Sequence, residues 1–349
     1  MKMTDTEKKK TPWLGALLKF VVPVVISCGL CWLLFKDFDL REMWTVIRTQ
    51  CDFRWIAAAL TLSVFSYIFR AMRWRIQLRA LGIDPPLFAL TLSIFGTYAV
   101  NLVFPRLGEV WRTGYIARRQ NASFTSVFGS MVADRLADTV TVALITLFTF
   151  LVASRQLIQY LSQNQETCQR IEHLIFSPWI WGAAVLMAAG LLYFLRHKWK
   201  NQFACKVQKA IYELWQGFAA IFRMPGKGRW LLLTAAIWGC FFMQLVLGFL
   251  AFGFTADIIA QYGITAALVT FVLSSISMAV PSNGGIGPWQ WAVMFSLGIY
   301  GLDTGRAGAF ANLILGSNTL MLIALGLFTF ACIALERRNH KTEINTHHL

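Results

Sequence analysis

The stretch Met278-Ala-Val-Pro281-Ser-Asn283-Gly284-Gly285-Ile-Gly287-Pro288 interrupts two apolar runs, Ile264 to Val280 and Trp289 to Tyr300. Its two prolines and three glycines cannot continue a helix, because proline lacks an N–H group and glycine costs backbone entropy. Irregular backbone between runs that are apolar enough to lie in a membrane is tolerated only where it is buried in protein or lines a cavity. The stretch therefore predicts a helix break inside a membrane protein.

The composition is that of a polytopic membrane protein. The chain is 57% apolar and 14% charged, whereas soluble domains are nearer 25% charged. Its net charge of +15 comes from lysines and arginines in short segments between apolar runs, as in cytoplasmic loops beside anionic lipid. We therefore expect membrane lipids, and no nucleic acid, as partners. Cys28 and Cys31 lie inside an apolar run and are expected to be core residues, so no metal or other cofactor is predicted.

Apolar length and the positive-inside rule predict the units of the first half. Residues 1–12 carry four lysines and should form a cytoplasmic tail. The units that follow are a span at 13–35, an amphipathic interfacial helix within 37–52, a span at 53–69, a hairpin at 87–121 and a span at 124–153. The hairpin is preferred over a full span at 87–104, which would place Arg112, Arg118 and Arg119 outside.

The same rules predict the second half. The units are an external loop at 155–177, a span at 179–195, a basic cytoplasmic segment with an amphipathic helix at 196–229, a span at 230–254, a hairpin at 264–300, a span at 307–335 and a cytoplasmic tail at 336–349. The last span ends at Glu336-Arg337-Arg338 and so should end inside. The second hairpin then begins and ends outside.

The two halves, 13–153 and 179–335, share the order span, span, hairpin, span and start on opposite sides. This order predicts the inverted repeat of many transporters. The expected fold is all-α, with about six full spans plus two re-entrant helical hairpins, eight hydrophobic helical units in one transmembrane domain at 13–335. The hairpin tips share the pattern Pro-x-x-Gly, at 105–108 and 281–284.

Ionisable residues cluster around the first tip and in the span that follows it. A charge at the bilayer centre costs at least about 2.5 kcal/mol, so these residues should pair with one another or face a water-filled cavity. Asp134 and Asp138 are one turn apart on one helix face. One interpretation is a polar pocket in which arginines hold an anionic head group. The alternative is that the aspartates only neutralise Arg106, Arg112 or Arg135.

The second tip offers backbone N–H groups near a helix start, which favour an anion; the alternative is a turn without a ligand. The candidate substrate-binding residues are Asn101, Arg106, Glu109, Arg112, Asp134, Arg135, Asp138, Ser282, Asn283, Gly284, Gly285 and Gly287. For the asparagine, interhelical hydrogen bonds are the alternative explanation. A separate set of arginines should anchor the chain to lipid phosphates and set its topology: Arg70, Arg73, Arg75 and Arg79.

Four motifs occur in a characteristic order: Arg-x-x-Arg-Trp (70–74), Asn101…Pro105-Arg106-x-Gly108-Glu109…Arg112, Asp134-Arg135-x-x-Asp138 and Pro281-x-x-Gly284-Gly285-Ile286-Gly287. Together they resemble the flippase-like transmembrane region of bacterial lysylphosphatidylglycerol synthases, which also occurs in stand-alone membrane proteins. The resemblance covers about residues 13–335. Ser282 and Asn283 stand where many relatives have a second proline before the glycine pair, a departure that concerns head-group preference.

The resemblance implies a lipid flippase of the bacterial inner membrane, multi-pass, with both termini cytoplasmic. Its substrate would be a polar-headed phospholipid or polyprenyl-phosphate lipid. Synthases of this family carry a large cytoplasmic aminoacyltransferase domain. Only 14 residues follow the last expected span here, so we expect that domain, and enzymatic activity, to be absent. Without an ATP site, movement would be downhill or ion-coupled, with Glu109, Asp134 or Asp138 as candidate proton carriers.

Two other functions remain open. The chain could be an accessory protein that presents lipid to a separate synthase or glycosyltransferase, which would then be a partner. It could also be an integral-membrane transferase that uses its carboxylates as a general base.

Overall fold

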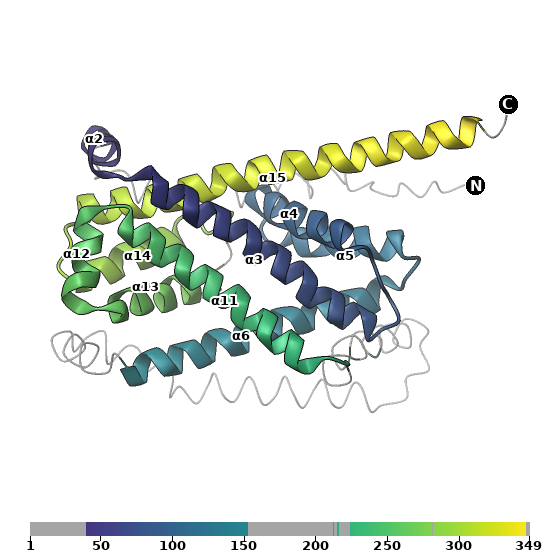
Figure 1. The fold of residues 1–349 in the computed structure, drawn as a ribbon, viewed down its shortest axis with the longest axis horizontal. Helices are drawn as coiled ribbons and strands as arrows, with labels where there is room; N and C mark the ends of the chain where they lie inside the picture. Colours follow the sequence, from purple (N-terminus) through teal and green to yellow (C-terminus); the bar gives the residue numbers. More distant parts are fainter. Residues whose placement is uncertain (1–39, 153–211, 213–214, 216–223, 281, 347–349) are drawn as a thin grey trace, which may run out of the picture.

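A computed structural model describes residues 40–152, 212, 215, 224–280 and 282–346, and the regular elements among them are all helices (Figure 1). Their bounds are α2 Leu40–Gln50, α3 Phe53–Arg79, α4 Leu87–Val103, α5 Leu107–Arg119, α6 Phe124–Val152, α11 Lys227–Leu250, α12 Gly253–Tyr262, α13 Ile264–Ser277, α14 Pro288–Ile299 and α15 Thr304–Thr346. The expected all-α architecture is confirmed for this part of the chain.

Four of these helices, α3, α6, α11 and α15, are long and apolar enough to cross a membrane. A fifth span results if α12 and α13, which meet at an angle of 111°, are one broken span. The predicted spans at 53–69, 124–153, 230–254 and 307–335 coincide with these four helices. The predicted spans at 13–35 and 179–195, the tail at 1–12, the loop at 155–177 and nearly all of 196–229 lie outside the described residues.

Two helices are longer than the sequence predicted. The helix expected to end at residue 69 continues to Arg79 as α3, because Arg70 and Arg73 turn into the protein and the basic residues do not mark its end. The last helix, α15, continues from the expected end at 335 to Thr346. The short helix α12 was not predicted. The amphipathic helix expected within 37–52 is present as α2.

The first hairpin consists of α4 and α5, joined by a tight turn. Arg106 in this turn has a left-handed backbone, with φ of 62°. The Asn101 side chain accepts a hydrogen bond from the Gly108 N–H group at 2.8 Å. A Cβ atom at Gly108 would lie 2.2 Å from the Thr97 carbonyl oxygen, so only glycine permits this close approach of the two helices.

The second hairpin consists of α13 and α14. Gly284, Gly285 and Gly287 between them all have positive φ, which confirms the predicted helix break. The Gln290 side chain closes the start of α14 by accepting a hydrogen bond from the Gly287 N–H group at 3.0 Å. Its amide nitrogen donates to the Asn312 side chain on α15. The Gln290 side chain therefore holds the α14 end of the break through two hydrogen bonds.

The helices pack in two matching sets around a central pair. In Figure 1, α3 and α11 lie side by side, and they form the largest helix contact. Around them, α4 contacts α15 and α5 contacts α6, whereas α13 contacts α6 and α14 contacts α15. Exchanging α4 with α13, α5 with α14 and α6 with α15 converts the first two of these contacts into the last two. Two apolar cores result, one around Phe249 and Phe310 and one around Trp74 and Ile116.

The two hairpin tips meet. The Arg106 guanidinium of the first tip donates a hydrogen bond to the Ala279 carbonyl oxygen at the end of α13, at 2.7 Å. A Cβ atom at Gly284 of the second tip would lie 2.6 Å from Cδ2 of Leu102 on α4. The tips are thus joined by a hydrogen bond and by close packing.

Candidate functional site

Seven ionisable side chains from three helices gather in the interior, and we call them the charged cluster. Helix α3 contributes two arginines, α5 a glutamate and an arginine, and α6 two aspartates and an arginine. Its members are Arg70, Arg73, Glu109, Arg112, Asp134, Arg135 and Asp138. The sequence predicted five of these residues as one site, and the structure adds the two arginines of α3.

The aspartates of α6 pair mainly with α3. Arg70 Nη1 lies 2.5 Å from one Asp138 oxygen, and Arg73 Nη2 lies 2.8 Å from the other. Arg73 also lies 2.6 Å from Asp134. Because Asp134 and Asp138 are four residues apart, both carboxylates face α3 together. The expected neutralisation of charge therefore occurs, with Arg70 and Arg73 as the principal partners in place of Arg106, Arg112 or Arg135.

Arg112 occupies a different position in the charged cluster. Its side chain is fully buried, and its guanidinium lies over the Trp74 ring, 4.5 Å from the centroid. None of its three nitrogens has a hydrogen-bond partner among the described residues. Its nearest opposite charge is Asp134, at 3.6 Å. A buried guanidinium without hydrogen bonds is costly, so an anion that supplied acceptors would be favoured here.

Glu109 lies at the edge of the charged cluster and is only half-buried. It accepts a hydrogen bond from Arg135 at 2.8 Å and one from the Asn101 amide at 3.2 Å. Asn101 therefore serves both the turn of the first hairpin and this carboxylate. Four guanidinium groups face three carboxylates in the charged cluster, so it carries an excess of one positive charge.

The remaining predicted residues lie at the tip contact. Arg106 is exposed and binds the Ala279 carbonyl rather than an aspartate. In the second tip, Ser282 is half-buried, and Asn283 is buried with no hydrogen-bond partner for its side-chain oxygen within the described residues. The residues predicted as one binding site thus fall into two places, the charged cluster and the tip contact.

The structure separates the four arginines that the sequence grouped as a lipid anchor. Arg70 and Arg73 are buried in the charged cluster, whereas Arg75 and Arg79 lie near the surface, where both bind Asp84. The hydrogen bonds from Arg79 and Arg75 hold the pKa of the Asp84 carboxyl below its ordinary value. Spacing could have revealed the difference: Arg70 and Arg73 lie on one helix face with buried Trp74 and Gln77.

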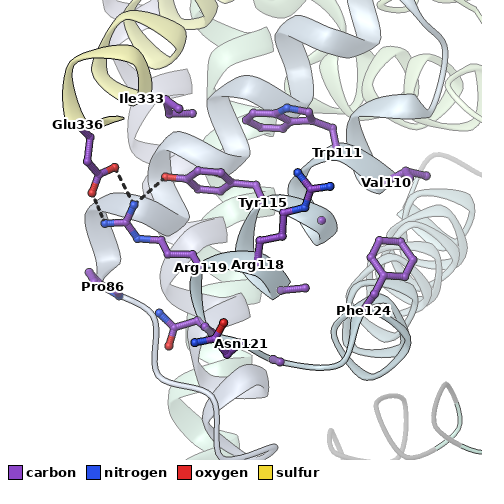
Figure 2. A pocket seen from close by; sticks show the side chains of 14 residues that line it. Pro86, Val110, Trp111, Tyr115, Arg118, Arg119, Asn121, Phe124, Ile333 and Glu336 are labelled. Carbon is purple, nitrogen blue, oxygen red and sulfur yellow. Dashed lines mark hydrogen bonds and ion pairs between the residues drawn. The ribbon is translucent and has the colours of Figure 1, made fainter. Parts of the chain in front are cut away.

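A groove of about 1490 Å³ lies on the outer side of α5, between α5, the start of α6 and the end of α15 (Figure 2). Its wall on α5 includes Val110, Trp111 and Tyr115, whereas Glu109 and Arg112 lie on the opposite side of the same helix. The groove and the charged cluster are therefore separated by α5. At one end, Arg119 pairs with Glu336 at 2.5 Å.

Over the described residues, no group of three histidine, cysteine or acidic side chains is placed to hold a metal ion. The charged cluster offers instead fixed guanidinium groups, one of which lacks hydrogen-bond acceptors. Such an arrangement can bind an oxyanion by charge-assisted hydrogen bonds.

Comparison with known proteins places these features in a family. The model of the lysylphosphatidylglycerol synthase TM region matches residues 20–326. A curated relative, glycosyltransferase AglD of Haloferax volcanii, is 37% identical over 89 residues, which are 25% of this chain and 14% of that protein. The chain thus matches only a small part of the length of that relative.

Proposed function

Because this chain belongs to the family of the lysylphosphatidylglycerol synthase TM region, we propose that it is a lipid flippase. It moves a lipid with an anionic head group, a phospholipid or a polyprenyl-phosphate lipid, between the leaflets of the bacterial inner membrane. The observation that carries this proposal is the fully buried Arg112 guanidinium, which lacks hydrogen-bond acceptors in the described structure.

A phosphate group would complete the charged cluster. Its oxygens accept the hydrogen bonds that Arg112 does not make, and its negative charge balances the one excess positive charge. Arg70 and Arg73 are already fixed by Asp134 and Asp138, so these side chains need not reorganise when the head group binds. The acyl chains remain in the bilayer beside the protein while the head group crosses.

The packing of the helices supports an inverted repeat, because the contacts of α4 and α5 with each other, with α3, with α6 and with α15 have counterparts in the contacts of α13 and α14 with each other, with α11, with α15 and with α6. Figure 1 shows the end of α3, the beginning of α11 and the end of α15 toward the same side of the molecule, opposite to α12. In the proposed topology this side is cytoplasmic, the two hairpins enter from opposite faces, and both termini are cytoplasmic.

Thiol labelling from each side of the membrane tests this topology. In a chain without its native cysteines, Asp84→Cys should react with an impermeant reagent only from the cytoplasmic side. Asp303→Cys should react only from the other side, because Asp303 precedes α15. Cysteines at Arg106 and Ser282, in the two tips, should be protected from both sides. Labelling of Asp84→Cys and Asp303→Cys from one and the same side would contradict the inverted repeat.

Reconstitution into liposomes with fluorescent lipids tests the flippase activity. The wild-type protein should move an anionic lipid between leaflets, and Arg112→Gln should slow this movement about tenfold or more, since hydrogen bonds to charged groups contribute about 1.5–3 kcal/mol. Arg48→Gln, an exposed arginine on α2, is the matched control and should behave as wild type. An unchanged rate in Arg112→Gln would rule out the charged cluster as the head-group site.

A second candidate function is that of an accessory protein that presents lipid to an enzyme. It is favoured by the comparisons, since the family is named for a synthase and a relative is a glycosyltransferase. This function predicts co-purification with a lipid-modifying enzyme and no lipid movement by the purified chain in liposomes. In either case we propose that this chain binds lipid and does not itself catalyse a reaction.

A further inference from the structure

The groove outside α5 has one apolar wall and one polar end. Val110, Trp111, Phe124 and Ile333 line its apolar part. The polar part is formed by Arg119, Gln120, Asn121 and Glu336, and Arg118 lies between the two parts. Such a lining matches a molecule with a long apolar portion and a polar, anionic head.

One cation in the groove is available to a ligand. Arg119 is engaged by Glu336 and lies 3.4 Å from the Tyr115 hydroxyl. Arg118 is exposed, and its side chain makes neither a hydrogen bond nor an ion pair with any described residue. In Figure 2 its side chain extends along the groove toward Trp111, away from the ion pair of Arg119 with Glu336.

The groove lies at the depth where apolar helices give way to charged residues. The apolar part of α15 ends at Glu336, and Ile333 lies one turn before it. The basic end of α5 is at Arg118 and Arg119. In the proposed topology the apolar wall faces the hydrocarbon, and the arginines lie at the level of lipid head groups, where each basic side chain adds to the binding of anionic lipid.

We propose that this groove is a second lipid-binding site, occupied by an anionic phospholipid of the adjoining leaflet. The phosphate binds Arg118, and an acyl chain lies along Trp111, Val110 and Phe124. A volume of about 1490 Å³ exceeds that of sites for drug-sized ligands, roughly 300–1,000 Å³, which suits an acyl chain with its head group. This site does not depend on lipid movement through the charged cluster. Since α5 forms a wall of both sites, a bound lipid would also fix the helix that carries Arg112.

Quenching of tryptophan fluorescence by brominated phospholipids tests this site in the full-length chain. The signal of Trp111 is obtained as the difference between wild type and Trp111→Phe. We expect brominated phosphatidylglycerol to quench it more strongly than brominated phosphatidylcholine. Arg118→Gln should reduce the preference about fivefold, the contribution of one basic side chain near a membrane surface. Arg48→Gln should leave the preference unchanged.

A variant that blocks the groove tests whether lipid occupies it without changing how the protein folds. A Cβ atom at Gly114, which lines the groove, would meet nothing nearer than Phe124, at 4.0 Å, so the leucine of Gly114→Leu is expected to extend into the groove without disturbing the helix. It should abolish the quenching of Trp111 by both lipids without lowering the thermal stability. Quenching that persists in Gly114→Leu would overturn the proposal.

Two further outcomes would also overturn it. Equal quenching by the two lipids in the wild type would show that the site does not select an anionic head group. Displacement of brominated phosphatidylglycerol by soluble glycerol phosphate would indicate a site for free phosphate rather than lipid. Lipid movement in liposomes is measured in parallel with Gly114→Leu and Arg112→Gln, so failure of this site and failure of the flippase activity are distinguishable.

Discussion

The Arg112 guanidinium lies over the indole ring of Trp74, with 4.5 Å between its central carbon and the ring centroid. The guanidinium makes this cation–π contact and lies 3.6 Å from Asp134, but it makes no hydrogen bond to any described residue. The position is fixed by α3 and α5, which carry the two side chains. A buried guanidinium without hydrogen-bond acceptors lowers the stability of the folded protein unless a ligand supplies those acceptors.

We therefore expect Arg112→Met to separate stability from function. Removing one member of a buried ion pair is costly, by about 3–5 kcal/mol, when it leaves the other charge without a partner. Asp134 keeps Arg73 at 2.6 Å when Arg112 is replaced, so this cost does not arise. Thermal unfolding in detergent should thus be unchanged or shifted upward, while lipid movement in liposomes falls at least about tenfold. A marked loss of thermal stability in Arg112→Met would mean that Arg112 is a structural residue.

Replacing Asp138, unlike replacing Arg112, should lower the stability of the protein. Asp138→Leu removes a partner from both Arg70 and Arg73, and an uncompensated buried charge costs about 3–5 kcal/mol. We expect a large loss of stability in thermal or denaturant unfolding. The double variant Arg70→Met/Asp138→Leu should recover part of it, because one of the stranded charges is gone. No recovery in the double variant would show that the two residues are not coupled.

The ion pair of Arg119 with Glu336 should contribute little despite its short distance of 2.5 Å. Both side chains are partly exposed, and exposed ion pairs contribute about 0–1 kcal/mol. A double-mutant cycle with Arg119→Gln and Glu336→Gln should give a coupling energy below about 1 kcal/mol that decreases in salt. A coupling as large as that of Arg70 with Asp138 would contradict this view of the groove end.

Gly284→Ala should loosen the contact of the two hairpin tips. The backbone at Gly284 has φ of 63°, and the added methyl group would lie 2.6 Å from Leu102. A left-handed backbone costs a non-glycine residue roughly 1–2 kcal/mol, and the collision adds to this cost. Adding Leu102→Ala should relieve the collision and leave the backbone cost. Unfolding temperatures of the single and double variants measure both parts, and equal stability of wild type and Gly284→Ala would contradict the tip geometry.

Asp84 should give the surface of the protein a pH-dependent contribution to stability. Hydrogen bonds from Arg79 and Arg75 lower the pKa of its carboxyl, so the stabilisation is present above the unfolded-state value of about 3.9. It is lost as the pH falls through the lower pKa of the folded state. Asp84→Asn should therefore unfold at a slightly lower temperature than wild type at pH 7, and the difference should shrink below about pH 3.9. A constant difference at all pH values would contradict this assignment.

The sequence predicted most helices, since apolar length and Pro-Gly breaks are local signals. It predicted both helix breaks, with tips at 105–108 and 281–284 where the structure has breaks at 104–106 and 278–287, and the family that the comparisons then showed. It missed α12, because the expected span at 230–254 and the expected hairpin at 264–300 left only a short connection there, which contains Asp257 and Gln261. It also ended α3 too early, because Arg70 was assigned to the membrane surface.

The partners of the charged residues could not be predicted from the sequence. Asp134 and Asp138 were expected to face arginines near them in the chain, whereas Arg70 is 68 residues away from Asp138. Which helices lie side by side decides this pairing, and contacts between distant segments leave no local pattern. The groove was missed for the same reason, since α15 contributes one of its walls from the far end of the chain.

The pairing of α3 with α6 also has a consequence for how the protein is made. The ribosome completes α3 with two arginines before the aspartates of α6 exist, and 68 residues separate Arg70 from Asp138. At roughly 5–20 residues per second, this interval lasts about 3–14 s. During that time the arginines of α3 have no carboxylate partners from α6. Transfer of α3 into the lipid is then unfavourable, because unpaired charges are costly in the bilayer. We therefore expect the insertion machinery to retain α3 until α6 emerges, so that this part of the chain enters the bilayer as a group of helices rather than one helix at a time.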